Sequence, residues 1–371
     1  MVGAPPRADD LAFMSRALAL AECGLYTTTP NPHVGCVIVR DGVAIGEGFH
    51  AHAGGPHAEA AALADVRAQG RDARGSTAYV NLEPCNHHGR TPPCSRALID
   101  AGVARVVFAM RDPYAPAQGG AAALAAAGIE VTEGVLEDEA RELNAGFVSN
   151  VTRAMPWVRS KLAASLDGRS ALVNGQSQWI TGAAARADGH AWRARACAIV
   201  TGVGTVVQDD PALTVRDVAT TRQPLRIVID RHGDTPRDAR VLADNHALIV
   251  TAQRKPGATF GDVEVLDLPN ADGKVDLVAL MRVLARRGIN EVHVEAGAKL
   301  NGALLDAGLI DEFLVYLAPS LIGDPARGMA ERAMPLASLA ERVPLEFRHV
   351  DRIGVDLRII ARVVRDAPQE T

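Results

Sequence analysis

A histidine and two cysteines in the first third of the chain have the types and spacing to bind one zinc ion. His57 lies in the segment Gly54-Gly55-Pro56-His57-Ala58-Glu59, and Cys85 and Cys94 enclose eight residues. One imidazole and two thiolates are preferred zinc ligands, and three protein ligands leave a fourth position open for water. Zinc lowers the pKa of such a water to near neutral, which makes it a usable nucleophile. These residues therefore predict a hydrolytic zinc site.

Glu59 is the candidate proton carrier of this site, because a carboxylate beside the water can take its proton and pass it on. On a regular helix, side chains two positions apart diverge by about 200°. His57 and Glu59 can therefore both face the metal only at a helix end. The order H-x-E followed by P-C approximates the signature of zinc-dependent deaminases, although that signature places two residues between its cysteines.

Other interpretations of the same cysteines stay open at this point. The chain has five cysteines, an odd number, which favours thiols or metal ligands over a disulfide framework. Each cysteine alone fits a small buried hydrophobic residue. A structural zinc site usually has four protein ligands, and His87 or His88 offers the fourth. The position of Glu59 favours catalysis over that alternative.

The elements that must position these residues follow an alternating pattern. Up to about residue 150, the sequence predicts helices at 11–21, after Pro56, from Cys94, at 117–127 and at 137–144, and strands on both sides of Asp41-Gly42 and at 76–82, 104–110 and 129–132. We expect an aspartate, Asp9 or Asp10, to cap the first helix. Strands separated by helices indicate an α/β sandwich.

A second α/β series follows a junction near Met155-Pro156. It has predicted strands at 157–165, 196–202, 224–230, 246–252, 291–297 and 312–319, and helices at 183–195, 276–287 and 299–307. At 371 residues the chain is long enough for two domains. The predicted domains are residues 1–150 and 151–371, both of the α/β class.

The composition restricts the partners. The net charge is −5 and the pI is near 6.1, whereas nucleic-acid-binding proteins usually have a basic face. No apolar run is long enough to span a bilayer, and the first residues lack the profile of a secretory signal. We therefore expect a cytoplasmic protein that binds neither nucleic acid nor membrane.

Several longer motifs resemble the bifunctional riboflavin-biosynthesis deaminase/reductase family. In the first half they are Thr29-Pro30-Asn31-Pro32-His33-Val34-Gly35, the segment 54–59 and Pro84-Cys85-Asn86-His87-His88-Gly89-Arg90-Thr91-Pro92-Pro93-Cys94. In the second half they are 161–169 (KLAASLDGR), 177–181 (SQWIT), 209–216 (DDPALTVR) and 294–297 (VEAG). The resemblance runs from about residue 9 to about residue 362.

This resemblance implies a fold and two consecutive reactions. It implies an N-terminal cytidine-deaminase-like α/β/α sandwich and a C-terminal dihydrofolate-reductase-like α/β domain. The first domain would use Zn²⁺ to deaminate 2,5-diamino-6-(ribosylamino)pyrimidin-4-one 5′-phosphate. The second would use NADPH to reduce the ribosyl chain, giving 5-amino-6-ribitylaminouracil 5′-phosphate. The implied partner is this small-molecule substrate. We also expect the chain to form a homo-oligomer.

In the deaminase domain, the resemblance implies His57, Cys85 and Cys94 as metal ligands and Glu59 as the proton carrier. Substrate would be bound by Asn31, His50, His87, Arg90 and Asp112, with His87 and Arg90 at the phosphate, for which an arginine fork is well suited. The chain departs from the family at one position. It has Asp112-Pro113-Tyr114 where the family commonly has Asp-Pro-Asn, so no contact of that asparagine is carried over.

In the reductase domain, no G-x-G-x-x-G is present, but glycines follow two predicted strands at 202–204 and 297–302, where backbone N–H groups can meet a phosphate. The resemblance implies that NADPH contacts Ala163, Trp179, Thr205, Asp209 and the turn Gly297-Ala298-Lys299-Leu300-Asn301-Gly302-Ala303. Arg231 is the candidate for its 2′-phosphate. Lys161 and Glu295 would flank the reacting carbon as catalytic residues, and substrate would also contact Ser177, Arg193, Leu213 and Arg216.

Two other classes of protein share part of this pattern. An RNA-editing deaminase would use the same zinc ligands, but it would need a basic face and no second α/β domain. A zinc-stabilised binding module would need no residue in the position of Glu59. The acidic pI and the second domain favour the bifunctional enzyme.

Overall fold

The computed structural model describes residues 7–87, 92–323 and 325–365. The chain divides into two compact units, Met1–Ala154 and Met155–Thr371. The last helix of the first unit, α6 (Ala145–Arg153), crosses residue 150, where we expected the boundary, so the units separate four residues further along. Among the described residues, no helix is both long and apolar enough to cross a membrane.

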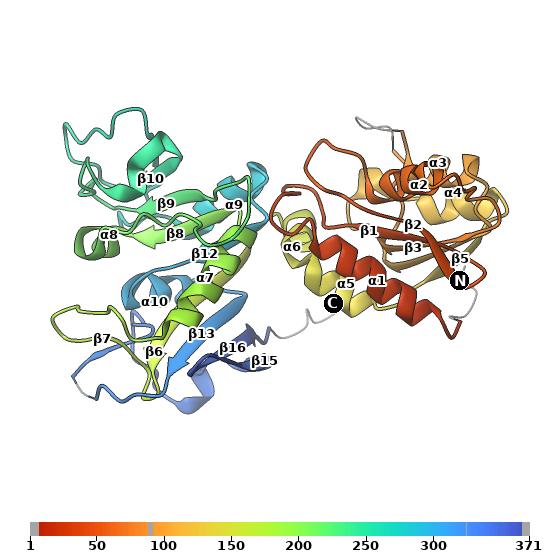
Figure 1. Cartoon of the computed structure of the whole chain (residues 1–371). Coiled ribbons are helices and arrows are strands. Elements are labelled where there is room, and N and C mark those ends of the chain that lie inside the picture. The colour runs from red at the N-terminus through yellow and green to blue at the C-terminus, as the bar shows by residue number, and fades with distance from the viewer. Residues whose placement is uncertain (1–6, 88–91, 324, 366–371) are drawn as a thin grey trace. The chain divides into compact units, whose positions relative to one another are not determined.

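The first unit is built on a five-stranded sheet in the order β2-β1-β3-β4-β5 (Figure 1). β1 (Gly35–Arg40) pairs antiparallel with β2 (Val43–Phe49) and β3 (Thr77–Leu82), whereas β4 (Arg105–Met110) and β5 (Glu130–Glu133) continue the sheet in parallel. The turn between β1 and β2 is made by Asp41 and Gly42, whose φ angles are 51° and 74°. These positive values are those of a type I′ turn, which Asp-Gly favours, and they confirm the strands predicted on both sides of it.

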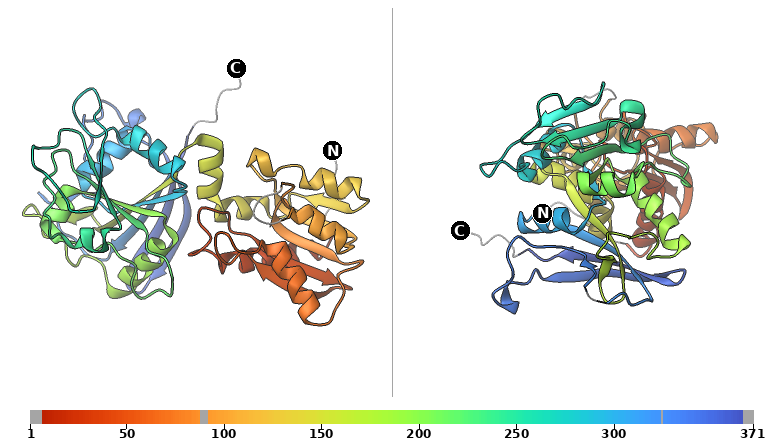
Figure 2. Two further views of the ribbon diagram at one scale, coloured as in Figure 1. Left: turned by 90° about the horizontal axis from the view of Figure 1, so that it is seen from above. Right: turned by 90° about the vertical axis from the view of Figure 1, so that its left-hand side faces the viewer.

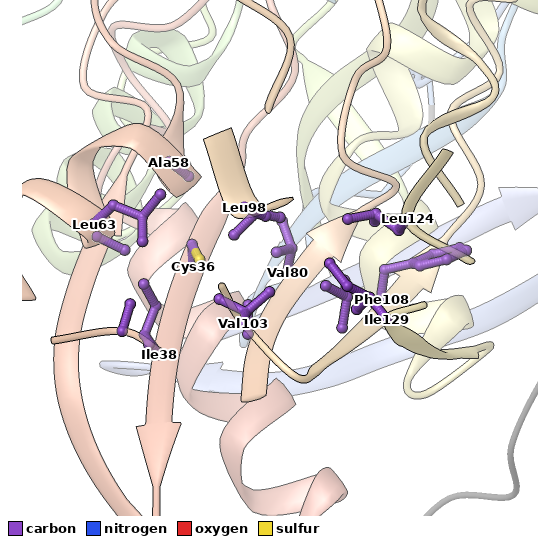
Figure 3. Packing of buried hydrophobic residues seen from close by; sticks show 14 of the residues in the cluster. Cys36, Ile38, Ala58, Leu63, Val80, Leu98, Val103, Phe108, Leu124 and Ile129 are labelled. Carbon is purple, nitrogen blue, oxygen red and sulfur yellow. The ribbon is translucent and has the colours of Figure 1, made fainter. Parts of the chain in front are cut away.

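Alternate residues of the strands face two different layers of helices. Cys36 and Ile38 of β1 lie in a core with residues of α2 (Ala58–Ala68), α3 (Cys94–Asp100) and α4 (Gly120–Ala126), as Figure 3 shows. Val37 and Val39 face the opposite side, against α1 (Asp10–Glu22) and α5 (Glu137–Leu143). This alternation has the period of two that strands impose, and it confirms the α/β/α sandwich.

One local expectation for this unit was wrong. Neither Asp9 nor Asp10 caps α1 with its side chain. Asp10 is instead fully buried, and its carboxylate accepts hydrogen bonds from Arg105 and Tyr79, because the buried guanidinium of Arg105 needs a charged partner. The helix after Pro56 begins only at Ala58.

The second unit contains a nine-stranded sheet in the order β11-β10-β9-β8-β12-β6-β13-β16-β15 (Figure 1). The strands are β6 (Trp157–Ser165), β8 (Ala198–Gly202), β9 (Leu225–Ile229), β10 (Ala247–Thr251), β11 (Glu264–Asp267), β12 (Glu291–Val294), β13 (Glu312–Ala318), β15 (Leu345–Ile353) and β16 (Asp356–Val363). Among these nine strands only β16 runs in the opposite direction: it pairs antiparallel with β13 and with β15, whereas all the other pairings are parallel. The hairpin β15–β16 is seen in dark blue in Figure 2. A small second sheet pairs β7 (Arg169–Ala171) with β14 (Arg327–Gly328).

Helices cover both faces of the large sheet. α9 (Leu277–Arg286) and α10 (Ala298–Asp306) pack on one face through a large apolar core. α7 (Ala183–Arg195) and α8 (Val203–Asp209) pack on the other. Beneath α7 the sheet is strongly charged: Arg159 pairs with Glu291 at 3.1 Å and with Glu312 at 2.6 Å. This charged layer leads along the strands to the residues predicted to be catalytic.

Candidate active sites

The three predicted zinc ligands of the first unit converge. His57 Nδ1 lies 3.6 Å from Cys85 Sγ and 3.3 Å from Cys94 Sγ, and the three ligand atoms all lie within 4.8 Å of one another. All five cysteines are free thiols, so no disulfide competes for these sulfur atoms. One imidazole and two buried or nearly buried thiols form a donor set that fits Zn²⁺ and leaves a fourth position open.

Each ligand is placed by the end of an element. His57 is the N-cap of α2 with an extended backbone (φ −71°, ψ 160°). Cys85 follows β3, and Cys94 is the first residue of α3. The backbone N–H of Cys94 also donates to Cys85 Sγ at 3.5 Å, which favours the thiolate form of Cys85. The helix-end geometry required for His57 and Glu59 is therefore present.

Glu59 lies in the first turn of α2 and is only 3% exposed. Burial, and next the negative charge of Cys85, raise its pKa to about 7. Its carboxyl group also interacts with the Cys94 thiol. A buried carboxyl group next to the ligand atoms is well placed to exchange a proton with a nucleophile bound there.

Asn31 and His50 form a hydrogen-bonded pair beside the ligands. His50 Nδ1 donates to the carbonyl oxygen of Pro56 at 2.8 Å, and its Nε2 accepts from Asn31 Nδ2 at 3.0 Å. Because a carbonyl can only accept, this arrangement requires a neutral imidazole with its proton on Nδ1. Burial lowers the pKa of His50, which maintains the neutral form. The ring also meets that of His57 edge-on, with 5.6 Å between centroids.

Asp112 and His87 are brought to the same side of this site. Asp112 is buried after β4, and burial is the main reason that its pKa rises to about 6, with His87 opposing the rise. Its Oδ1 accepts from the backbone N–H of Tyr114 at 2.9 Å, while the Tyr114 side chain is exposed. Within the described part of the chain, His87 Nδ1 has no hydrogen-bond partner. Arg90 and His88 lie outside the described residues.

Glu83 is a buried residue of this region that sequence reasoning missed. Its carboxylate accepts from the backbone N–H of Ala121 at 3.0 Å and from that of Asp112 at 3.4 Å. Its place directly before Pro84-Cys85 was the only available signal. Both partners are backbone groups, which no side-chain pattern can indicate.

In the second unit, Lys161, Glu295 and Arg193 are brought together. Arg193 donates to both carboxylate oxygens of Glu295, with 2.8 Å from Nη2 to Oε2, and Nη1 donates to the carbonyl oxygen of Thr214 at 3.1 Å. Burial alone would raise the pKa of Glu295, but the Arg193 charge lowers it well below the ordinary value. Burial lowers the pKa of Lys161, although Glu295 opposes this shift. Arg193, which was predicted to contact the substrate, is thus bound to Glu295 in this structure.

The strand order predicts a binding crevice next to these residues. From β8 the chain passes through α8 to β9 on one side, and from β12 it passes through α10 to β13 on the other. Open parallel sheets bind ligands outside the carboxyl ends of the strands at such a switch point. α8 and α10 both begin there, behind the glycine N-caps Gly202 and Gly297. Thr201 Oγ1, at the end of β8, is buried without a hydrogen-bond partner in the described residues.

The other predicted cofactor residues divide into two groups. The first group lies on β6, on α8 or on α10 with its N-cap, the elements that border the switch point: Ala163, Thr205, Asp209, Gly297, Ala298, Lys299, Leu300 and Ala303. Asn301 and Gly302 have structural partners instead. Asn301 Oδ1 accepts from Ser160, its Nδ2 donates to Ala296, and a Cβ on Gly302 would lie 1.8 Å from the Glu331 carbonyl oxygen.

The remaining predicted residues of this unit lie in loops. Trp179 is 69% exposed, with the Arg186 guanidinium 4.5 Å from its ring centroid, and Ser177 is half-buried in the same loop. Leu213 is buried in an apolar cluster, and Arg216 is exposed. Arg231 follows β9, where it donates to Gln253 at 3.0 Å, and its Nε has no partner among the described residues. An arginine with an unused buried donor fits an anionic group such as the 2′-phosphate.

Sequence reasoning also missed the residues around Lys161. The Lys161 ammonium lies 5.8 Å from the centroid of the Tyr316 ring, and the Tyr316 hydroxyl donates to Asp188 at 2.6 Å. His293, fully buried two positions before Glu295, lies 3.5 Å from the Glu295 carboxylate. Strand register places these residues on one face, but that pairing requires the sheet order, which the sequence alone did not provide.

Each of the two units matches a known protein family. Residues 7–110 match the family model of the cytidine and deoxycytidylate deaminase zinc-binding region, and residues 156–359 match the RibD C-terminal domain. The riboflavin biosynthesis proteins RibD of Escherichia coli and Haemophilus influenzae are 47% and 44% identical, covering 94% of this chain and 98% and 96% of theirs.

Two solved structures also resemble the chain over nearly its whole length. RibD of Acinetobacter baumannii is 42% identical with a TM-score of 0.87. A diaminohydroxyphosphoribosylaminopyrimidine deaminase/5-amino-6-(5-phosphoribosylamino)uracil reductase of Thermotoga maritima is 35% identical with a TM-score of 0.88. Each comparison covers 96% of this chain and 99% of the other.

The fold and the sites thus define a zinc-dependent deaminase domain joined to a dihydrofolate-reductase-like reductase domain. The match over both units excludes a single-domain RNA deaminase and a non-catalytic zinc module. The chain belongs to the RibD family of bifunctional deaminase/reductases, and it carries the deaminase step and then the reductase step of riboflavin biosynthesis. Its cofactors are zinc, at His57, Cys85 and Cys94, and NADPH.

Proposed function

We propose that residues up to Ala154 deaminate the diaminopyrimidine ribosyl phosphate and that residues from Met155 reduce the product. The observation that carries this proposal is the position of buried Glu59 beside the three convergent ligand atoms of the first unit. Zinc held by His57, Cys85 and Cys94 supplies a nucleophile at neutral pH by lowering the pKa of a bound water. Glu59 takes up one proton of the attacking water and delivers it to the ring nitrogen. It then carries the second proton, released as the new hydroxyl group becomes a carbonyl, to the departing amine, which leaves as ammonia.

The neighbouring side chains bind the substrate and fix its orientation. Because Asn31 directs its amide nitrogen to His50, its Oδ1 faces the other way and is available to accept from the pyrimidine. Asp112 and His87 hold the sugar phosphate together with Arg90. For Asp112, the raised pKa supports a contact with a sugar hydroxyl, because a partly protonated carboxyl group can both donate and accept.

In the reductase unit, NADPH supplies a hydride to the carbon that begins as C1′ of the ribose. The accompanying proton needs an acid, and Glu295 is held ionised by Arg193. For Lys161, on the other hand, burial lowers the pKa, so its ammonium form gives up a proton more readily, and the charge of Glu295 opposes this shift. We assign Lys161 as the proton donor and Glu295 as the group that orients it. Ser177, Leu213 and Arg216 are assigned to the rim of the substrate site.

A coupled assay tests the order of the two reactions. Ammonia release and NADPH absorbance are followed together after the diaminopyrimidine ribosyl phosphate is added. We expect one ammonia per NADPH consumed, with ammonia appearing first. NADPH consumption from the diaminopyrimidine without ammonia release would contradict the proposed order.

We further propose a cytoplasmic homo-oligomer. The free thiols at the zinc site support a reducing compartment. The edge strand β15 supports self-association, because Phe347, Val350 and Leu345 are exposed there, and exposed edges of this kind pair readily. Sedimentation of the wild type and of Phe347→Glu tests this proposal. A lower mass for the variant is expected, and a monomeric wild type would refute it.

A further inference from the structure

Glu83 connects three segments of the deaminase domain, two of which contain functional residues. It is 6% exposed at the end of β3, two residues before the zinc ligand Cys85. Its Oε1 accepts from the backbone N–H of Ala121 at the start of α4, and its Oε2 accepts from the backbone N–H of Asp112 after β4. One carboxylate thus holds two backbone groups in place beside the ligand loop.

The helix α4 has no cap of its own. Its N-cap is Gly119, which has no side chain, and its first turn contains no acidic residue. The first N–H groups of a helix need acceptors from elsewhere, and a carboxylate is a favourable one. Glu83 supplies this acceptor from another part of the chain, and its charge strengthens both hydrogen bonds.

The ligand loop and α4 also pack in direct backbone contact. A Cβ on Gly120 would lie 1.7 Å from the Pro84 carbonyl oxygen, so only glycine allows this approach. Beyond Cys85, the backbone N–H of Asn86 donates to the Ala117 carbonyl oxygen at 2.9 Å, and Ser95 donates to the Asn86 side chain at 2.8 Å. The segment from Asp112 to Ala121 is therefore bound to the described part of the ligand loop at several points, and in these contacts Glu83 provides a charged group.

We propose that Glu83 is a positioning residue that sets the place of Asp112 relative to the zinc ligand Cys85. This inference rests on the proposed role of Asp112 in binding substrate. Glu83 itself does not contact substrate. It acts through two backbone groups, so its loss moves the substrate-binding carboxylate while the three zinc ligands are retained.

Glu83→Gln is the first test, because the amide has one acceptor oxygen and would turn an NH₂ group toward the second N–H. Zinc content should stay near one per chain, and the rate of reduction of the deaminated intermediate should be unchanged. The deaminase kcat/KM should fall about 10-fold or more, chiefly through KM, because a small displacement of a binding group weakens substrate alignment. Glu133→Gln is the matched control, since Glu133 is a nearby carboxylate that pairs with exposed Arg111.

Ala121→Pro tests the hydrogen bond between Glu83 and α4 by itself. It removes one of the two N–H groups that Glu83 binds, at a first-turn position where proline is tolerated. It should raise the deaminase KM as well, and the double variant with Glu83→Gln should raise KM by less than the two separate effects combined, because both changes act on the placement of one carboxylate. If Glu83→Gln does not fold, Ala121→Pro decides the question alone.

Several outcomes would overturn the inference. These are a KM for Glu83→Gln within twofold of that of Glu133→Gln, an unchanged KM for Ala121→Pro, or loss of zinc in step with activity. Asp112→Asn separates this inference from the proposed function. If Asp112→Asn leaves KM unchanged, the role of Asp112 itself fails; if it raises KM while Glu83→Gln does not, only the role of Glu83 fails.

Discussion

Arg193 donates to both carboxylate oxygens of Glu295, at the end of β12 where the reductase crevice opens. The pair is mostly buried, and it leaves Glu295 as a fixed negative charge with no proton to give. Lys161 faces this charge from β6 and is the nearby cation that can lose a proton. The sequence predicted Lys161 and Glu295 only as a pair of catalytic residues. The ion pair between Arg193 and Glu295 indicates a different role for each of them.

Lys161→Met should abolish most of the reductase activity. The variant keeps the length of the side chain but has no proton to donate, so the rate of NADPH oxidation with the deaminated intermediate should fall by about 10²- to 10⁴-fold. Ammonia release from the diaminopyrimidine should be unchanged. In the wild type, reduction should decline as the pH rises, because Lys161 then loses the proton that it donates. Since burial lowers the pKa of Lys161, this decline should begin below the ordinary lysine value of 10.5. Equal loss of both activities would contradict this assignment.

Glu59→Gln should separate metal binding from deamination. Glutamine keeps the size of the side chain but cannot carry the proton, so ammonia release should fall by about 10²- to 10⁴-fold. Metal analysis should still find about one zinc per chain, because Glu59 is not a ligand. A variant that released ammonia at the wild-type rate would disprove the proton role.

Cys85→Ala should remove zinc together with deaminase activity. With one of the three ligands gone, a site of this kind loses most of its affinity. Cys23→Ser is the matched control, because Cys23 is an exposed thiol of the same domain. A chelator should have the same selective effect on the wild type, with reduction of the deaminated intermediate retained. Zinc bound at full occupancy by Cys85→Ala would rule out the ligand set.

Arg231→Ala should weaken NADPH binding more than NADH binding. The lost guanidinium would contact only the 2′-phosphate, and a hydrogen bond to a charged group is worth about 1.5–3 kcal/mol. We therefore expect the KM for NADPH to rise about 10- to 100-fold while the KM for NADH stays constant. Arg287→Ala, which removes a surface arginine paired with Glu264, should change neither value. An equal rise in the KM for NADPH and for NADH would contradict the assignment of Arg231 to the 2′-phosphate.

Asp10→Asn should destabilise the deaminase domain. It breaks a buried ion pair with Arg105, which typically costs about 3–5 kcal/mol in the free energy of unfolding. Burial would raise the pKa of Asp10, but Arg105 and its other partners lower it. The ion pair therefore contributes fully above the ordinary aspartate value of about 4, and its contribution is lost as the pH falls through the lowered value.

Urea unfolding of the wild type and Asp10→Asn at several pH values measures this contribution. The difference between them should be largest near neutral pH and should shrink below about pH 4. Asp9→Asn, at the exposed neighbouring position, should behave like the wild type throughout. A constant difference down to pH 2 would mean that the charge of Asp10 is not responsible.

Local patterns predicted the local features of this chain. The Asp41-Gly42 hairpin needs only a turn that tolerates positive φ, and the ligand set needs only residue types and an element boundary. The hairpin β15–β16 escaped prediction because most of β15 is exposed and lacks a buried alternating face. Helix α6 was not predicted either, because few of its residues are buried.

Pairings between distant residues could not be predicted from local patterns. Arg193 and Glu295 are 102 positions apart, and they meet because α7 lies across the sheet above β12. The partners of Glu83 are backbone N–H groups, which are the same at every position except proline. Both pairings depend on how the helices and strands are arranged in space, and neither produces a recognisable spacing of side chains in the sequence.

Each unit of this chain has a hydrophobic core of its own, the first from residues before Ala154 and the second from residues after it. Heat should therefore disable the two activities separately rather than together. A sample held at a temperature between the two melting points would release ammonia without oxidising NADPH, or reduce added intermediate without making it. At such a temperature one domain should be unfolded while the other keeps its activity, so the chain should catalyse only one of its two reactions.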